Sequence, residues 1–391
     1  MHRPLLVASL AFFASAIASP LSTSRRDSCY DLQIQVSVIE KRYIINATVD
    51  DDWDVASLTL NLTRRDFVSS DDPLPIAGET LSAIESLFTI GATFCGTGGP
   101  TLLLTHGIIE SKLYWQPDIV DSDEYNFVNF AVAAGYSVLS YDRIGIGSSS
   151  KVDALTDAQF QVEVAVLNAL AKYARETLGA TRVALIGHSY GAYISAQSAA
   201  ALGQVVDSLV LTGFSGTFAY FNPFLAGAGF RVAKTKDPVR WGCLDPGYLT
   251  TSDLYAETYV YFAEPYFEHR VAEWAYDVAS EPFAVGELPS LLATTVAYGN
   301  ITAPTLLLQG QFDLSACGGN CVGLLDEFKG NLTSAPIVKT VDNLPAGYDF
   351  PLPVKHVEID LTNTLRHNLF LHKIAPQAFD IVLEFFKQQG F

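Results

Sequence analysis

Short apolar runs, each ended by turn residues, recur along the chain from about residue 100. Such a run is typical of a strand buried on both faces of a parallel sheet, where side chains on either face must be apolar. Apolar residues return at helical spacing between the runs, so strands and helices alternate. This alternation predicts an α/β fold with a mostly parallel sheet covered by helices on both faces. The predicted strands are 101–105, 138–141, 183–186, 208–211, 305–308 and 354–361, and the predicted helices are 124–134, 157–177, 191–203 and 376–389.

Two regions depart from this pattern. Residues 31–50 alternate apolar and polar side chains, which indicates antiparallel strands half exposed to water. Residues 215–300 are rich in aromatic side chains and show no buried strand, so we expect an inserted, mainly helical cap. Most of these aromatics should pack the cap, and a few should line a pocket, so that changing Trp241 or Tyr259 would alter substrate preference. The expected core is then 27–214 and 301–391.

Composition narrows the class of protein. Of the 391 residues, 49% are hydrophobic and 17% are charged, so the chain can bury a large core. The formal net charge of -18 repels phosphate backbones and anionic lipid surfaces. Nucleic acid is therefore not an expected partner, and the composition leaves the oligomeric state open.

The first residues have the pattern of a secretory signal peptide. Residues 4–18 are apolar and end in Ala16-Ile17-Ala18, an A-x-A cleavage site, so residues 1–18 should be removed. Arg25-Arg26 is a possible second processing site. The apolar stretch is too short to span a bilayer, so we expect a secreted, extracellular protein without a stable membrane anchor. In such a protein, four N-x-[ST] sequons mark glycosylation sites at Asn46, Asn61, Asn300 and Asn331.

The cysteines fit an oxidising compartment. There are five, so at least one thiol stays unpaired. Cys317 and Cys321 flank a flexible Gly-Gly-Asn segment and are the candidates for a disulfide that closes a small ring. Zinc would need two such pairs or histidines at ligand spacing, so neither a metal nor another cofactor is expected.

The clearest chemical motif is G-x-S-x-G at residues 187–191. It follows the predicted strand 183–186 directly and opens the predicted helix 191–203. A serine on so sharp a turn is held in a strained conformation, and its neighbours two residues away must be small so that strand and helix can approach. The helix N-terminus places N–H groups beside the serine oxygen. We therefore predict that Ser189 is a nucleophile.

A serine nucleophile needs a base to remove its proton and a carboxylate to orient that base. Both should follow later strands, at the carboxyl edge of the sheet. Asp313 lies just past strand 305–308. Three histidines compete for the role of base: His356 lies in or beside the last predicted strand, His367 in the loop after it, and His372 near the final helix. A loop at a strand end can bring an imidazole to Ser189, which favours His367.

The same chemistry requires donors for an oxyanion. The N–H of Tyr190 is one candidate, since it follows the nucleophile. The second should come from the loop after strand 101–105, where Gly107 permits a tight turn before Ile108. We predict that the N–H groups of Tyr190 and Ile108 form the oxyanion hole.

Further segments match a known pattern: LTHGI at 104–108, YDRIGIGS at 141–148, GQFD at 310–313, and HNLFLH at 367–372 followed by Ala375-Pro376. With the serine motif, they resemble the secreted fungal members of the α/β-hydrolase superfamily over about 95–215 and 300–391. The resemblance implies a triad of Ser189, Asp313 and His367, in the chain order of that superfamily, and a structural turn at 142–148. Arg366 stands where such proteins usually have glycine.

These features predict a serine hydrolase, a carboxylic ester hydrolase that cleaves an ester or lactone of a small apolar molecule through an acyl-enzyme. The same residues could cleave an amide or a carbon–carbon bond. A non-catalytic ligand-binding protein on a hydrolase scaffold is the alternative from another class. The acyl and alcohol groups of the substrate are not readable, because fold and triad do not specify them.

Overall fold

The computed structural model describes residues 29–63, 74–344 and 367–391. Its centre is an eight-stranded sheet with the strand order β1-β4-β6-β5-β7-β8-β12-β13. The six strands from β6 to β13 run parallel, whereas β1 and β4 join them antiparallel at one edge. In chain order the strands are β1 Cys29–Glu40, β4 Ile84–Cys95, β5 Gly99–Thr105, β6 Ser137–Tyr141, β7 Ala180–His188, β8 Ser208–Thr212, β12 Thr305–Gly310 and β13 Val338–Leu344.

Five of the six predicted parallel strands are confirmed, within a few residues. The strands β6, β8 and β12 are buried along their whole length, which is why their apolar runs are continuous. The sixth prediction, 354–361, lies outside the described residues. The strand β13 closes this edge of the described sheet. The side chains of 338–342 are half-buried and include Lys339 and Asp342, so this segment leaves no continuous apolar run.

The antiparallel strands confirm the alternation at residues 31–50. Ile34, Val36 and Val38 are buried, while Gln35 and Ser37 between them are exposed. The strand β1 pairs with β4 along its full length, and a disulfide between Cys29 and Cys95 joins the two strands. The sequence did not single out this pair, because only the register of β1 on β4 sets the two cysteines opposite each other.

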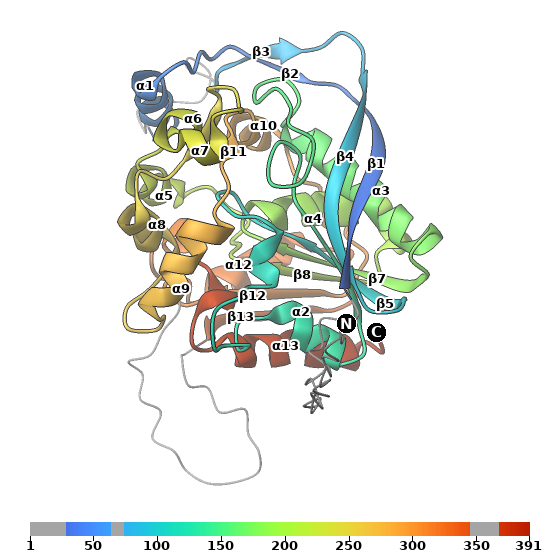
Figure 1. The fold of residues 1–391 in the computed structure, drawn as a ribbon. Coiled ribbons are helices and arrows are strands. Elements are labelled where there is room, and N and C mark those ends of the chain that lie inside the picture. The colour runs from blue at the N-terminus through green and yellow to red at the C-terminus, as the bar shows by residue number, and fades with distance from the viewer. Residues whose placement is uncertain (1–28, 64–73, 345–366) are drawn as a thin grey trace, which may run out of the picture.

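The predicted core helices are confirmed and cover both faces of the sheet. Figure 1 shows α3 and α4 on one face and α2 and α13 on the other. These helices are α2 Phe127–Ala133, α3 Phe160–Glu176, α4 Tyr190–Leu202 and α13 Ala375–Gln388. Smaller elements of the core are β2 Tyr43–Ile45, α1 Asp52–Thr63, β3 Ile76–Glu79, η2 Lys112–Trp115, η3 Gly203–Val205, α11 Leu314–Cys317, α12 Leu324–Phe328, η6 Lys329–Asn331 and η7 Leu369–Leu371.

Residues 215–300 contain short helices, as expected of a cap, and lie to one side of the sheet in Figure 1. The expectation that this region has no buried strand is wrong, because β9, β10 and β11 form a small antiparallel sheet with Tyr248 and Leu249 buried. Strands of two or three residues are too short to leave a periodic pattern. The elements are α5 Phe221–Ala228, β9 Arg231–Val232, α6 Ala233–Lys236, α7 Pro238–Trp241, β10 Tyr248–Thr250, α8 Leu254–Tyr261, α9 His269–Trp274, η4 Ala275–Ala279, β11 Phe283–Ala284, α10 Glu287–Ala293 and η5 Tyr298–Asn300.

Two further observations complete the fold. A second disulfide joins Cys317 to Cys321, the pair that the sequence suggested, and Cys243 is a free, exposed cysteine. Within residues 29–63, 74–344 and 367–391, no helix combines the length and the apolar character needed to cross a membrane.

Candidate active site

Ser189 is the single residue between strand β7 and helix α4. Its φ of 54° lies in the left-handed region, which a non-glycine residue adopts only under strain. The flanking glycines permit this turn: a Cβ on Gly187 would lie 2.4 Å from the carbonyl oxygen of Gly191, and one on Gly191 would lie 2.3 Å from that of Thr105. The sharp turn expected from the G-x-S-x-G spacing is therefore present.

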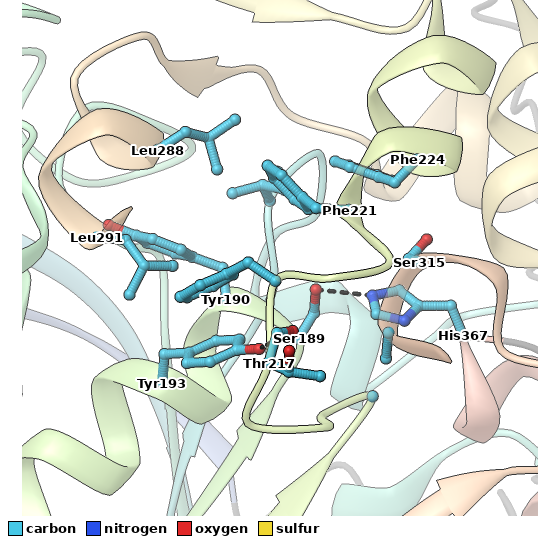
Figure 2. Close-up of a pocket in the computed structure, with 14 residues that line it drawn as sticks. Ser189, Tyr190, Tyr193, Thr217, Phe221, Phe224, Leu288, Leu291, Ser315 and His367 are labelled. Carbon is cyan, nitrogen blue, oxygen red and sulfur yellow. Dashed lines mark hydrogen bonds between the residues drawn. The ribbon is translucent and has the colours of Figure 1, made fainter. Parts of the chain in front are cut away.

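The structure brings Ser189, His367 and Asp313 together from three separate parts of the chain. The Ser189 Oγ lies 2.7 Å from Nε2 of His367, and the His367 Nδ1 lies 2.7 Å from Oδ2 of Asp313 (Figure 2 shows the first of these bonds). Because Asp313 offers an acceptor, Nδ1 of the neutral imidazole carries the proton and Nε2 is free to accept one from the serine hydroxyl.

Asp313 is held rigidly at the end of strand β12. Its side chain is fully buried and caps helix α11, with Oδ1 accepting a 2.7 Å hydrogen bond from the N–H of Ala316. The amide of Gln309 donates a short hydrogen bond to Oδ2. A carboxylate with these partners is suited to orienting an imidazole and stabilising its protonated form.

The other candidate histidines do not reach Ser189 in the structure, as far as they are described. His372 is buried near the start of α13, with its Nδ1 2.7 Å from the carbonyl oxygen of Asn368, and its Nε2 accepts a hydrogen bond from the N–H of Ala263. His356 lies outside the described residues. Arg366, which departs from the usual glycine, also lies outside them.

The residues expected to form the oxyanion hole line the same cavity as Ser189 and His367. Tyr190 is the first residue of α4, where a backbone N–H has no partner four residues back in the helix. Ile108 lies on the loop after β5, and the hydroxyl of Tyr261 donates a 2.7 Å hydrogen bond to its carbonyl oxygen. Gly107 packs so closely that a Cβ there would lie 2.8 Å from the Cβ of Ser189.

The cavity above Ser189 is apolar and encloses about 450 Å³, including the space at its mouth. Figure 2 shows Phe221 and Phe224 of α5 and Leu288 and Leu291 of α10 facing Ser189. The full lining is Ile108, Ser189, Tyr190, Tyr193, Gly213, Thr217, Phe218, Phe221, Phe224, Leu288, Leu291, Ser315, Ala316 and His367.

Trp241 and Tyr259, the aromatics that the sequence suggested for substrate preference, do not line this cavity. Trp241 is buried under the guanidinium of Arg240, and its indole N–H donates to Glu281. The ring of Tyr259 lies near Gly227 and is half exposed. Aromatic density alone could not single out the lining residues, since most aromatics of this region pack against one another.

Two buried carboxyl groups beside the site were also missed. Burial raises the pKa of Glu110 to about 8 and that of Glu257 to about 7. The Oε2 of Glu110 accepts a 2.7 Å hydrogen bond from the N–H of Gly107, and Glu257 accepts hydrogen bonds from the hydroxyls of Thr251 and Ser280. Glutamates usually lie on the surface, so no sequence signal marked these two.

Two further expectations from the sequence concern metal binding, which was not expected, and the four glycosylation sites. Among the residues that the structure describes, no group of three or more His, Cys, Asp or Glu side chains could hold a metal ion. The four sequon asparagines, Asn46, Asn61, Asn300 and Asn331, are all exposed.

Relatives identified by sequence cover a limited part of the chain. It is 28% identical over 120 residues to a protein of Arabidopsis thaliana named "1-acylglycerol-3-phosphate O-acyltransferase", and 27% identical over 149 residues to a probable enzyme of the same name from Oryza sativa subsp. japonica. These matches cover 30% and 38% of this chain, and the chain spans only 26% and 30% of the length of those relatives.

Solved structures show the same fold at low identity. An esterase from Exiguobacterium antarcticum matches with a TM-score of 0.51 and 16% identity, over 77% of this chain and 96% of that one. A thermophilic esterase from Thermogutta terrifontis matches with a TM-score of 0.50 and 14% identity, over 78% and 95% of the two chains. The model of the alpha/beta hydrolase family matches residues 102–343, more than half of the chain. The chain therefore belongs to the alpha/beta hydrolase family.

Proposed function

We propose that this protein is a serine hydrolase that cleaves a carboxylic ester or lactone of a small apolar molecule through an acyl-enzyme. The observation that carries the proposal is the chain of two 2.7 Å hydrogen bonds from Ser189 through His367 to Asp313, with the serine oxygen in an apolar cavity. An activated serine, a base and an orienting carboxylate are the groups that acyl transfer requires.

The reaction would proceed in two steps. In the first, His367 removes the proton of Ser189 as its oxygen attacks the substrate carbonyl, and the N–H groups of Ile108 and Tyr190 bind the oxyanion. The imidazolium, stabilised by Asp313, returns the proton to the leaving alcohol. In the second, His367 removes a proton from water as the water attacks the acyl-enzyme. The imidazolium then returns this proton to the departing oxygen of Ser189, which releases the acid and the free enzyme.

The residues that line the cavity favour an uncharged, apolar substrate. No lysine or arginine is among the described residues that line it, whereas phenylalanine and leucine side chains surround Ser189. The net charge of -18 would further disfavour the approach of an anionic substrate.

Acyl transfer to an alcohol is a second candidate, favoured by the names of the two plant relatives. It would use the same acyl-enzyme, with an alcohol in place of water in the second step. The described lining offers no cation for the phosphate of a lysophosphatidic acid, so we place hydrolysis first. Product analysis with an added apolar alcohol, such as butanol, separates the two: an ester product shows transfer, and free acid alone shows hydrolysis.

A fluorophosphonate probe followed by a panel of chromogenic esters tests the proposal. We expect the wild type to be labelled at Ser189 and to turn over short and medium apolar esters, with Ser189→Ala as the control for both. A folded wild type that takes up no probe and cleaves no ester would instead favour the ligand-binding alternative. Matching anilide and diketone substrates measure amide and carbon–carbon cleavage.

We also propose that the protein is secreted and glycosylated. The two disulfides and the exposure of all four sequon asparagines support an oxidising, secretory route. The cleavage sites themselves lie outside the described residues. Mass spectrometry of the protein from culture medium of a eukaryotic host should find a terminus after residue 18 or 26 and a mass loss on glycosidase treatment; an intact Met1 and no mass loss would contradict it.

A further inference from the structure

Arg143 is a buried cation that the proposed reaction does not use. It lies on the turn after β6, in the segment that the resemblance assigned only a structural role, and its side chain is 1% exposed. Its Nη1 contacts two carboxylates, Oε1 of Glu163 on α3 at 2.5 Å and Oε2 of Glu287 on α10 at 2.8 Å. Burying three charged side chains together costs desolvation free energy, so the presence of this cluster calls for a reason other than stability.

The other contacts of Arg143 lead to the two residues expected to bind the oxyanion. Its guanidinium lies 4.7 Å from the centre of the Tyr190 ring, and its Nη2 lies 3.4 Å from the carbonyl oxygen of Gly107. That carbonyl belongs to the same planar peptide group as the N–H of Ile108. Holding the oxygen on one side of the peptide therefore sets the direction of the N–H on the other.

His106 adds a second link between Arg143 and this peptide. The backbone N–H of Arg143 donates to Nε2 of His106 at 3.2 Å, which places the proton of the neutral ring on Nδ1. The Nδ1 lies 2.8 Å from the carbonyl oxygen of Gly107 and donates to it. Burial lowers the pKa of His106, which keeps the ring neutral and this pattern of donors intact. Donors on a carbonyl polarise the peptide and strengthen its N–H as a donor.

We propose that Arg143, held between Glu163 and Glu287, is a positioning residue that aims the Ile108 and Tyr190 N–H groups at the oxyanion. This inference rests on the proposed hydrolase function. It adds to that function the residue that positions the groups stabilising the transition state. Glu287 belongs to the region 215–300, and its Oε1 accepts from the N–H of Ala284, so the position of that region also bears on the oxyanion hole.

Burial raises the pKa of both Glu163 and Glu287. Both carboxyl groups contact the same Nη1 of Arg143, so the loss of one leaves the other to hold the guanidinium. Neutralising either carboxyl alone should therefore be mild, whereas changing Arg143 removes the contacts to Tyr190 and Gly107 together. The loss should therefore be large for a change of Arg143 and small for a change of one carboxyl, which only leaves the guanidinium less firmly held.

The test compares turnover, KM and the affinity for an alkyl trifluoromethyl ketone, whose serine adduct carries an oxyanion. For Arg143→Lys we expect kcat and ketone affinity to fall about 10- to 100-fold while KM changes less than about threefold. The matched control is Arg42→Lys, a buried arginine bound to the Glu40 carbonyl and the Ser86 hydroxyl in another part of the fold. It should leave kcat and ketone affinity unchanged.

A triple variant separates positioning from stability. In the triple variant Arg143 is replaced by Met and both glutamates by Gln, so no charged side chain of this cluster stays buried. Its melting temperature should be higher than that of Arg143→Lys and closer to that of the wild type, while its kcat stays low. To keep the test decisive if either variant misfolds, Glu287→Gln is measured too, with an expected loss of ketone affinity of about threefold. Wild-type kcat in a folded Arg143→Lys or triple variant, or wild-type ketone affinity in Glu287→Gln, would overturn the inference. A wild type without hydrolysis would instead overturn the proposed function.

Discussion

The carboxyl edge of the parallel sheet and the region 215–300 meet at one cavity but contribute to it in different ways. From the sheet edge come polar groups with fixed partners: Ser189 on its strained turn and Asp313 with three hydrogen-bond donors around it. From the other region come apolar side chains, such as Phe221 and Leu288, that present a surface and no polar atom. If the proposed function holds, the loss of one polar atom at the edge should stop the reaction, whereas losses of apolar surface from the other region should change substrate preference gradually.

The largest expected effect lies at the sheet edge. Ser189→Ala and His367→Ala should each lower kcat on the order of a million-fold, and Asp313→Ala less, because the three groups act as a unit. The double variant of Ser189 and His367 should be barely worse than either single one. Turnover of an activated ester by each purified variant measures this, with circular dichroism as the folding check.

His372→Gln is the matched control for the base. Its ring contacts the Asn368 carbonyl and the Ala263 N–H, two backbone groups that the proposed reaction does not use, so stability should fall but the folded protein should keep its turnover. Loss of turnover in His372→Gln together with full activity in His367→Ala would move the base by five residues and leave the enzyme class standing.

The second effect tests the oxyanion loop. In Gly107→Ala the new Cβ would lie 2.8 Å from the Ser189 Cβ and 2.9 Å from Oε2 of Glu110, so the loop must shift. A shift of the loop would move the Ile108 N–H out of hydrogen-bonding distance of the oxyanion. We therefore expect kcat to fall about 100- to 1,000-fold. Gly330→Ala, where a Cβ would meet nothing within 4 Å, should have no effect. Equal turnover in the two variants would show that the Ile108 N–H is not a donor.

The third effect lies on the apolar side of the cavity. Phe221→Ala should change the preference between short and long acyl chains about tenfold, through KM, while kcat for acetate esters moves less than about threefold. Tyr259→Phe, outside the cavity, is the control and should behave as wild type. A preference that stays fixed across Phe221→Ala, Phe224→Ala and Leu288→Ala would mean that this region only packs against the sheet.

The smallest effect concerns the boundary between the two regions, where Glu110 and Glu257 are buried. Burial raises the pKa of Glu110 from an ordinary 4.5 to about 8 in the folded protein, so between these values the folded state binds a proton that the unfolded state has lost. The stability from this group is complete below pH 4.5 and is lost as the pH rises through about 8.

The melting temperature should accordingly fall from about pH 5 to about pH 8, and Glu110→Gln should flatten that fall because the amide does not titrate. Thermal unfolding at several pH values measures it. Glu327→Gln, at an exposed position, should keep the wild-type slope. A slope that is unchanged in Glu110→Gln would show that this carboxyl is ionised in the folded protein throughout.

The sequence by itself determined the local features of this protein. Continuous apolar runs predicted six parallel strands, of which the structure confirms five, since a strand buried on both faces favours apolar side chains. The G-x-S-x-G motif predicted the strand-to-helix turn at Ser189. These patterns are local because a few neighbouring residues are enough to show the periodicity of a strand or the spacing of a turn. Strands that carry polar side chains at an edge, such as β13, or span only two or three residues, such as β9 and β11, leave no such pattern and were missed.

Only the tertiary structure decided which distant residues meet. The pairing of Cys29 with Cys95 depends on the register of β1 on β4, and the choice of Phe221 over Trp241 as a lining residue depends on how α5 packs. The contact of Arg143 with Glu287 joins residues 144 positions apart, which no sequence spacing could indicate. The physical reason is that burial and hydrogen bonding between distant segments are set by packing, and packing exists only once the chain has folded.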